Sequence, residues 1–286
     1  MMSIFKSKER QKENVEKVET TEKKAKNGEV LIDIKDVELV YGTKSNPILA
    51  LHDINLEIKK GEFICVLGPS GCGKSTLLKI IAGFHQATSG SCTMNGKAIT
   101  GPDWHRGVVF QAPTLYPWMT IRENVEFGPR MRGLSEDEIE KVRLHFLEQV
   151  NLKGFGNKST FELSGGMKQR AALARVLSNY PEVILMDEPF GALDALTRDN
   201  MQGLIRDIWK KNNSTVFLIT HDIEEALSLG TRVIVMSKRP GTILREFNLD
   251  FTNRIYEGKN DRIKYTDEYL NLKDEMLEII NSQHVE

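Results

Sequence analysis

The sequence is organised around Gly68-Pro69-Ser70-Gly71-Cys72-Gly73-Lys74-Ser75-Thr76, which lies between two apolar runs. The run at residues 63–67 predicts a buried strand, and the run at residues 77–81 predicts a helix. The stretch has the form G-x-x-x-x-G-K-[ST], whose glycines let successive backbone N–H groups point at phosphate oxygens. Lys74 can reach the β- and γ-phosphates, and the Ser75 hydroxyl can bind Mg²⁺. The sequence therefore predicts a site for a nucleoside triphosphate.

Composition sets the broad class of the chain. Its 286 residues are enough for one large domain or two linked subdomains. The 39 basic and 40 acidic residues give a net charge of -1, so no bulk attraction to nucleic acid or to an acidic membrane is expected. Cys65, Cys72 and Cys92 show no metal-ligand spacing, which favours a reducing, cytosolic compartment. No apolar run reaches the length of a membrane span and the start lacks a signal core, so we expect a soluble chain that reaches a membrane only through a partner.

Changes in composition divide the chain. Residues 1–29 are rich in Lys and Glu and poor in apolar side chains, which predicts a disordered charged tail. Residues 30–111 and 181–247 predict an α/β core that includes an antiparallel β subdomain. Residues 112–180 are mostly helical and are interpreted as an inserted subdomain. Residues 248–286 predict a C-terminal extension that ends in a short helix.

The first part of the core predicts antiparallel strands. Residues 30–34 and 37–41 read as two strands that flank a short break, and a polar loop is expected at residues 42–47. The alternating pattern of residues 51–58 fits a strand with one wet face. Tyr41 lies at the expected strand end, where its ring can stack on an adenine; a core or edge tyrosine fits the spacing equally well.

Two carboxylates follow an apolar run at residues 183–186, which predicts a central parallel strand. Asp187 can hold Mg²⁺ through water, as expected of an acid at the end of such a strand. Glu188 can polarise a water as a general base. Because structural carboxylates usually avoid the end of a buried strand, this pair favours catalysis.

Two further side chains follow predicted strands. His221 comes directly after the apolar run at residues 215–220, which suits a contact with the γ-phosphate, although a single histidine is more often structural. Gln111 ends the short run at residues 107–111, where α/β folds place groups that face a ligand.

A second phosphate-type helix start is predicted at Leu163-Ser164-Gly165-Gly166, directly before a helix over residues 167–177. A plain helix cap explains the same residues. Two such starts are more than one nucleotide needs, and a head-to-tail dimer, in which each chain closes the other's site, would use both.

The order of these motifs resembles the nucleotide-binding subunit of ABC transporters over residues 30–245. The resemblance implies a P-loop NTPase (RecA-like) core that binds ATP and Mg²⁺. Residues 68–76 look like its Walker A, Gln111 its Q-loop, residues 163–166 its signature, residues 183–188 its Walker B with the catalytic glutamate, Asp194 part of its D-loop, and His221 its switch histidine.

This resemblance also implies roles for the same residues. Glu188, His221, Gln111 and Lys74 would be catalytic, and Ser75, Gln111 and Asp187 would lie at the metal. Nucleotide contacts would come from Tyr41, Gly68, Pro69, Ser70, Gly71, Cys72, Gly73, Lys74, Ser75, Thr76, Ser164, Gly165, Gly166 and Asp194. Many members have glutamine after the two signature glycines, where this chain has Met167.

A finer similarity is to the ATPases of nitrate, taurine and aliphatic-sulfonate importers, carried by residues 115–120, Met167 and residues 238–241. It implies a homodimer on the cytoplasmic face of the membrane, below two permease subunits and indirectly served by a solute-binding protein. The surface at residues 111–123 would receive a short permease helix. An exporter ATPase remains an alternative. A soluble ABC ATPase that acts on DNA or ribosomes is less well supported, because such proteins commonly carry two nucleotide-binding units or long coiled coils.

Overall fold

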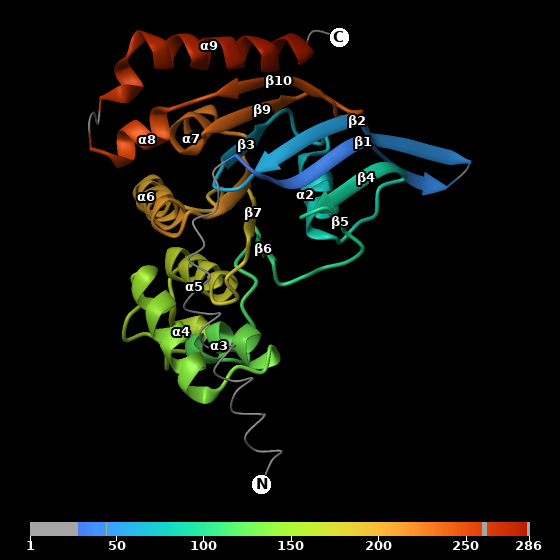
Figure 1. Cartoon of the computed structure of the whole chain (residues 1–286). Helices are drawn as coiled ribbons and strands as arrows, with labels where there is room; N and C mark the ends of the chain where they lie inside the picture. Colours follow the sequence, from blue (N-terminus) through green and yellow to red (C-terminus); the bar gives the residue numbers. More distant parts are fainter. Residues whose placement is uncertain (1–27, 44, 259–261, 285–286) are drawn as a thin grey trace.

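Two β-sheets form the framework of this α/β chain, one mixed and one antiparallel (Figure 1). The computed structural model describes residues 28–43, 45–258 and 262–284, so that most of the charged tail predicted for residues 1–29 lies outside the described residues. The strands of the larger sheet are β3 (Phe63–Leu67), β6 (Arg106–Val109), β7 (Val183–Asp187), β8 (Thr215–Ile219), β9 (Arg232–Met236) and β10 (Ile243–Asn248).

The larger sheet has the order β10-β9-β3-β8-β7-β6. Its strands from β9 to β6 are parallel, and only β10 among the described strands of this sheet pairs antiparallel. All five residues of β3 and of β8 are buried, as expected for apolar runs at the centre of a parallel sheet. Because parallel strands end at the same edge, the residues that follow β3, β7 and β8 meet there.

The smaller sheet contains β1 (Val30–Thr43), β2 (Asn46–Lys59), β4 (Ser89–Met94) and β5 (Lys97–Ala98), in the order β2-β1-β4-β5. The predicted break between two strands is wrong, because β1 is continuous. The register of β1 against β2 shifts between Ile34 and Val37, and Asp36 has a φ of 50° there. This irregularity accommodates the polar residues without ending the strand. The predicted polar loop at residues 42–47 is also mostly strand, and Tyr41 lies inside β1 rather than at its end.

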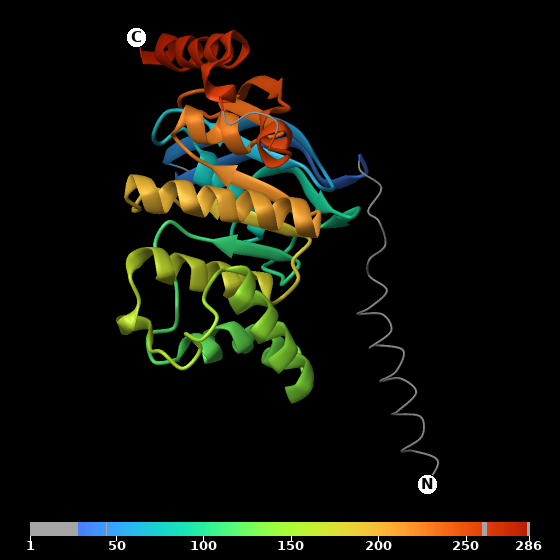
Figure 2. The same cartoon turned by 90° about the vertical axis from the view of Figure 1, so that its left-hand side faces the viewer.

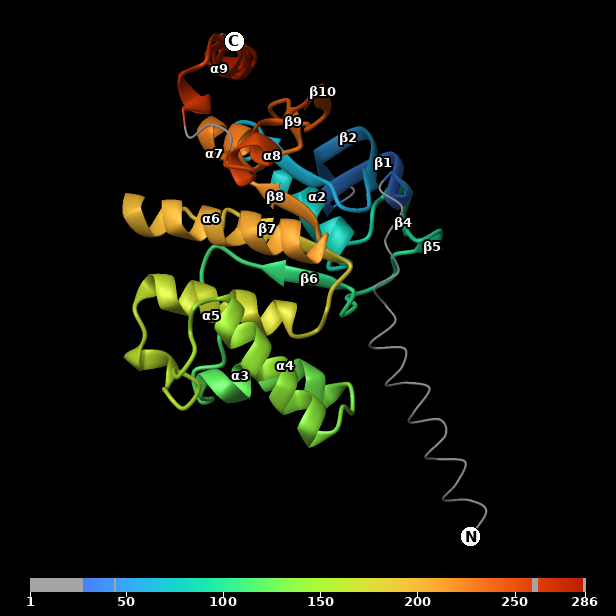
Figure 3. The same ribbon diagram turned by 60° about the vertical axis from the view of Figure 1, so that its left-hand side comes forward.

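Each face of the larger sheet has its own apolar core. Ile64 and Val66 of β3 point to one side, where they pack with α2 (Lys74–Ala82) and the antiparallel sheet. Phe63 and Cys65 point to the other, against helices that include α5 (Gly165–Leu177), α6 (Ala195–Asn212) and α7 (Ile223–Leu229). Figure 3 shows α6 in front of the sheet with α5 below it. The phosphate-loop helix and the signature helix therefore belong to different cores.

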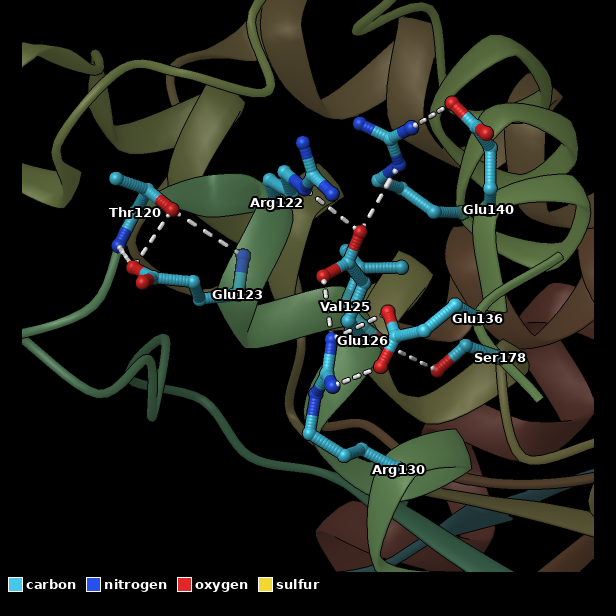
Figure 4. A network of polar contacts seen from close by, with 10 residues as sticks. Thr120, Arg122, Glu123, Val125, Glu126, Arg130, Glu136, Glu140 and Ser178 are labelled. Atoms are coloured by element: carbon cyan, nitrogen blue, oxygen red, sulfur yellow. Dashed lines mark hydrogen bonds and ion pairs between the residues drawn. The ribbon is translucent and has the colours of Figure 1, made fainter. Parts of the chain in front are cut away.

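The helical stretch begins with α3 (Ile121–Met131) and α4 (Glu136–Gln149), and continues through a short 3-10 turn, η1 (Thr160–Glu162), to α5 (Figure 2). Thr120 and Ser135 begin α3 and α4, each with a capping box. Polar side chains also tie α3 to α4, as Figure 4 shows.

Glu126 is the centre of that polar cluster, with a side chain only 4% exposed. Its Oε1 lies 2.8 Å from Arg122 Nε and 3.1 Å from Arg143 Nε, and its Oε2 lies 3.4 Å from Arg130 Nη2 (Figure 4). Removing one partner of a buried ion pair typically costs about 3–5 kcal/mol, because a charge is left uncompensated. The cluster therefore fixes α3 against α4. Ser178, at the C-terminal end of α5, connects that helix to α3 as well, because its Oγ donates to the Val125 carbonyl at 2.9 Å.

The C-terminal residues form α8 (Phe251–Tyr256), η2 (Ile263–Tyr265), α9 (Asp267–Asn281) and η3 (Ser282–His284). The predicted terminal helix is confirmed as α9, whereas α8 was not expected. Tyr269 and Met276 of α9 are buried, and Lys273 Nζ pairs with Glu224 of α7 at 2.5 Å. None of the helices in the described part of the chain has the length and apolar character that a membrane crossing requires.

Candidate functional site

The loop before α2 surrounds the side chain of Lys74. Lys74 is the first residue of α2 and is only 6% exposed, and its ammonium donates to the Gly68 carbonyl at 2.8 Å and the Pro69 carbonyl at 2.9 Å. These bonds are needed because a buried charge without partners is costly. Gly73 has a φ of 109°, and a Cβ there would lie 2.6 Å from Leu51 Cδ2, so only glycine fits.

The N-terminus of α2 differs from those of α3, α4 and α5. It has no side-chain cap, whereas Thr120, Ser135 and Ser164 cap α3, α4 and α5. The first N–H groups of α2 therefore keep their hydrogen-bonding capacity for a ligand, together with the positive end of the helix dipole.

A hydroxyl and a carboxylate meet beside this loop. Ser75 Oγ donates to Asp187 Oδ1 at 2.9 Å, which joins α2 to the end of β7. Burial raises the pKa of Asp187, while the bond from Ser75 opposes that rise. Oxygen ligands of this kind suit Mg²⁺, which usually takes its remaining ligands from water and phosphate. In the described ranges no group of three or more His, Cys, Asp or Glu side chains is arranged to hold a metal.

Glu188 and His221 are brought together by the pairing of β7 with β8. Asp187 lies opposite Ile219 in the parallel register. The side chains of Glu188 and His221, which follow these paired residues, therefore emerge at the same edge of the sheet. His221 Nδ1 lies 3.2 Å from Glu188 Oε2. Glu188 has a φ of 46°, a left-handed conformation that is uncommon for a residue other than glycine and often accompanies function. A carboxylate and an imidazole thus stand side by side, next to the residue that bonds to Ser75.

Gln111 reaches the same edge from β6. The strand ends at Val109 instead of extending to Gln111 as predicted, because the chain turns away from β7 after the Val109–Met186 pair. A Cβ built on Gly191 would lie 3.1 Å from Gln111 Nε2, so the amide reaches the loop that follows Glu188.

Two residues of α5 that were not predicted from the sequence bond to residues 110–114, which we call the Gln111 loop. Gln169 is 1% exposed, and its Nε2 donates to the Phe110 carbonyl at 3.1 Å. Arg175 Nη2 donates to Thr114 Oγ1 at 2.9 Å. The only signal in the sequence was a polar residue at a position of α5 that faces the apolar core. These bonds connect the signature helix directly to the Gln111 loop.

The signature residues and Asp194 lie at two helix starts that touch. Ser164 Oγ accepts from the Met167 N–H at 3.3 Å, and Asp194 Oδ1 accepts from the Thr197 N–H at 3.0 Å. The side chain and the N–H of Thr197 together lower the pKa of Asp194. A Cβ on Gly166 would lie 2.6 Å from the Thr197 methyl, so the two helices approach closely.

These helix starts are separate from the phosphate loop within one chain. Ser164 and Gly165 are exposed, and Met167 packs partly against the helical core. No hydrogen bond or ion pair between described residues connects Ser164, Gly165, Gly166 or Asp194 with residues 68–76. The structure therefore brings Lys74, Ser75, Asp187, Glu188, His221 and Gln111 to one edge, and leaves the signature outside that group.

Tyr41 lies beside the phosphate-loop helix. Its hydroxyl is 3.4 Å from Thr76 Oγ1, and its ring meets the His85 ring edge-on at 5.8 Å between centroids. The residue is 38% exposed, so part of its surface is open to solvent. That placement allows stacking on a base bound next to the loop.

Comparisons with known proteins agree with this geometry. The sequence profile of the ABC transporter family matches residues 51–191. The taurine import ATP-binding protein TauB of Roseobacter denitrificans is 51% identical over 233 residues, 82% of this chain and 87% of that protein. The nitrate import ATP-binding protein NrtD of Synechocystis is 44% identical over 257 residues, 89% of this chain and 97% of that protein.

A solved structure shares the fold as well. A dimeric ATP-binding cassette in a post-hydrolysis state, bound to ADP and Pi, has a TM-score of 0.68 and 35% identity, and the match covers 77% of this chain and 99% of that one. The likeness thus extends over nearly the whole length of each of these proteins. The chain therefore belongs to the ABC transporter family of ATP-binding proteins, and it is an ATPase.

Proposed function

We propose that this chain is the ATP-hydrolysing subunit of an importer for a small anion or organic solute such as nitrate, a sulfonate or taurine. The observation that carries the proposal is the 51% identity with a taurine import ATP-binding protein over 87% of its length. The 44% identity with a nitrate import ATP-binding protein supports the same class of transporter.

The residues at the sheet edge would share the chemistry of hydrolysis. Lys74 and the amides of residues 68–76 bind the phosphates, and Tyr41 stacks on the adenine. Ser75, Asp187 and Gln111 would hold Mg²⁺, which supplies positive charge to the β- and γ-phosphates when it is bound. Glu188 takes a proton from the attacking water. His221, 3.2 Å from Glu188, orients that carboxylate and contacts the γ-phosphate.

The remaining predicted residues would act between two chains. Ser164, Gly165, Gly166 and Asp194 are proposed to contact the nucleotide held by a second copy of this chain. Two observations support this: Ser164 and Gly165 are exposed, and an ATP-binding cassette of the same fold forms a dimer.

We also propose a role for each part of the chain. Residues 30–111 and 181–247 form the nucleotide-binding core, residues 112–180 the helical signature subdomain, and residues 248–286 a C-terminal extension. Trp118, 75% exposed, lies in the 111–123 surface proposed to receive a permease helix. Such docking would make the chain a peripheral subunit on the cytoplasmic face of the membrane, served indirectly by a solute-binding protein.

Uptake measurements test this proposal. In a strain that lacks this chain, we expect uptake of one radiolabelled solute among nitrate, taurine and an alkanesulfonate to be lost. The parent chain should restore that uptake, and the Lys74→Ala variant should not. Normal uptake of all three, combined with the retention of a normally exported compound inside the cells, would contradict the proposal and favour an exporter.

A further inference from the structure

Arg198 connects two segments of the site that are far apart in the sequence. It lies in the first turn of α6, and its Nη2 donates to the Leu193 carbonyl at 3.2 Å, in the loop that carries Asp194. Its Nη1 lies 4.0 Å from Asp222 Oδ2, and its Nε lies 3.9 Å from Glu225 Oε1. One side chain thus contacts both the loop before α6 and the first turn of α7.

Glu225 links Arg198 to residues 220–222, which we call the His221 turn. Its side chain is 8% exposed, and its Oε2 accepts from the Thr220 hydroxyl at 2.6 Å. Thr220 Oγ1 in turn accepts from the Asp222 N–H at 3.0 Å. His221 stands between Thr220 and Asp222, so both of its neighbours are held by this set of bonds.

The contacts of Arg198 with Asp222, Glu225 and the Leu193 carbonyl suit a guanidinium better than an ammonium. A buried carboxylate is costly without a positive partner, and burial raises the pKa of Glu225 while Arg198 opposes that rise. The planar guanidinium can face two carboxylates and a carbonyl at once, which a lysine ammonium on a flexible stem does poorly.

We infer that Arg198 is a positioning residue, which holds the Asp194 loop and the His221 turn in one fixed arrangement for hydrolysis. The inference rests on the roles proposed above for Asp194 and His221. A displacement of about 1 Å at a reacting group can cost up to roughly 10²-fold in rate, so a residue that fixes two such groups should affect kcat strongly.

Arg206 provides a matched control on the same helix. Two turns after Arg198, its Nη2 donates to the Ser228 carbonyl at 3.1 Å, at the other end of α7. It therefore also joins α6 to α7, but it contacts neither the Asp194 loop nor the His221 turn. Replacing either arginine by methionine keeps the apolar stem and removes the guanidinium.

The test measures steady-state ATP hydrolysis by the full chain, with thermal denaturation of each variant. Arg198→Met should lower kcat on the order of tenfold and leave the KM for ATP within about twofold, because the phosphate loop is unchanged. Arg206→Met should keep kcat within about twofold of the parent. Arg198→Lys should restore part of the loss.

A double-mutant cycle with Glu225→Gln identifies the pathway. If Arg198 acts through Glu225, the double variant should lose no more than the worse single variant. A normal kcat for Arg198→Met would overturn the inference. So would equal kcat losses in Arg198→Met and Arg206→Met, or losses that simply add with Glu225→Gln.

His221→Ala, assayed in parallel, distinguishes a failure of the positioning role of Arg198 from a failure of the proposed role of His221. If His221→Ala is inactive and Arg198→Met is normal, the positioning role alone is wrong. If His221→Ala hydrolyses ATP like the parent, the proposed role of His221 is wrong, and the positioning role fails with it.

Discussion

The starts of α2 and α5 look alike in sequence but differ in the structure. Glycines mark both starts, yet α2 begins without a side-chain cap, and its Lys74 is only 6% exposed and donates to loop carbonyls. In contrast, α5 begins at an exposed serine whose hydroxyl already caps its own helix. The first helix start is thus a site within one chain. The second lies outside that site, which supports the proposal that it contacts a nucleotide held by a second chain.

Lys74→Ala gives the largest expected effect, because it removes the cation from the complete helix start. We expect hydrolysis to fall by at least about 10³-fold and ATP binding to weaken, since the β- and γ-phosphates lose a charged partner. Turnover of ATP by the purified variant measures this. Lys97→Ala, on the exposed strand β5, is the control and should behave like the parent. Parental turnover by Lys74→Ala would remove α2 from the site.

Glu188→Gln should keep the first helix start intact and stop the reaction. The substitution keeps the size of the side chain and removes the base, so hydrolysis should fall by roughly 10²-fold or more. ATP should still bind, and the persistent γ-phosphate should then bridge Lys74 of one chain and Ser164 of the other. We expect an ATP-dependent dimer by size-exclusion chromatography, while the parent separates after hydrolysis.

Glu182→Gln is the matched control for that experiment, because Glu182 lies just before the other end of β7 and its side chain contacts Asn95 and His105, away from the site. It should hydrolyse ATP normally. Parental hydrolysis by Glu188→Gln would exclude Glu188 as the base. Loss of hydrolysis without dimerisation in ATP would keep the base and count against the bridge between the two helix starts.

Ser164→Arg tests the second helix start directly. A bulky cation there should lower hydrolysis roughly tenfold while ATP still binds to each separate chain, because the phosphate loop is untouched. Ser135→Arg is the control: Ser135 is also an exposed serine cap, so both variants lose a cap worth about 1 kcal/mol. Only Ser164→Arg should affect hydrolysis.

A mixed dimer sharpens this test. One chain carries Ser164→Arg and the other Lys74→Ala, so a head-to-tail arrangement places both changes in one composite site and neither in the other. Activity of the mixture should exceed that of either variant alone. Equal damage to both sites of the mixed dimer would contradict the idea that Ser164 serves the partner's nucleotide.

Much of the fold was predictable because its signals are local. The apolar runs at β3, β7 and β8 are each followed directly by the loop, the carboxylates or the histidine, so their order gave the α/β class and the edge at which they meet. The break predicted in β1 was wrong because a bulge keeps pairing through polar residues. A sequence pattern shows polarity but not whether a partner strand continues alongside.

The supporting contacts of the site could not be predicted for a different reason. Gln169 bonds to a carbonyl 59 positions earlier, and Arg198 faces a glutamate 27 positions later (225 − 198). Neither residue belongs to a spaced motif with its partner, so only the folded chain reveals the contact. The roles of the motif residues themselves, such as Gln111 and His221, stay predictions until variants are measured.

Tyr41 gives the smallest expected effect, because it adds to the complete helix start without contacting the phosphates. If its ring stacks on adenine, Tyr41→Ala should weaken ATP binding by about 0.5–1.5 kcal/mol, roughly two- to tenfold in Kd. Tyr41→Trp should preserve binding, since a larger aromatic face stacks at least as well.

Tyr256 is the control for this last measurement, because it is 36% exposed against 38% for Tyr41 and lies on α8, where Lys210 approaches its ring. Fluorescent ATP titrations of Tyr41→Ala, Tyr41→Trp and Tyr256→Ala should separate stacking from packing. Tyr41→Ala could instead bind ATP like the parent and melt at a lower temperature. That result would mean that Tyr41 stabilises the fold through its contacts with Thr76 and His85 and does not stack on adenine. Nucleotide affinity at the first helix start would then come from the phosphate loop alone.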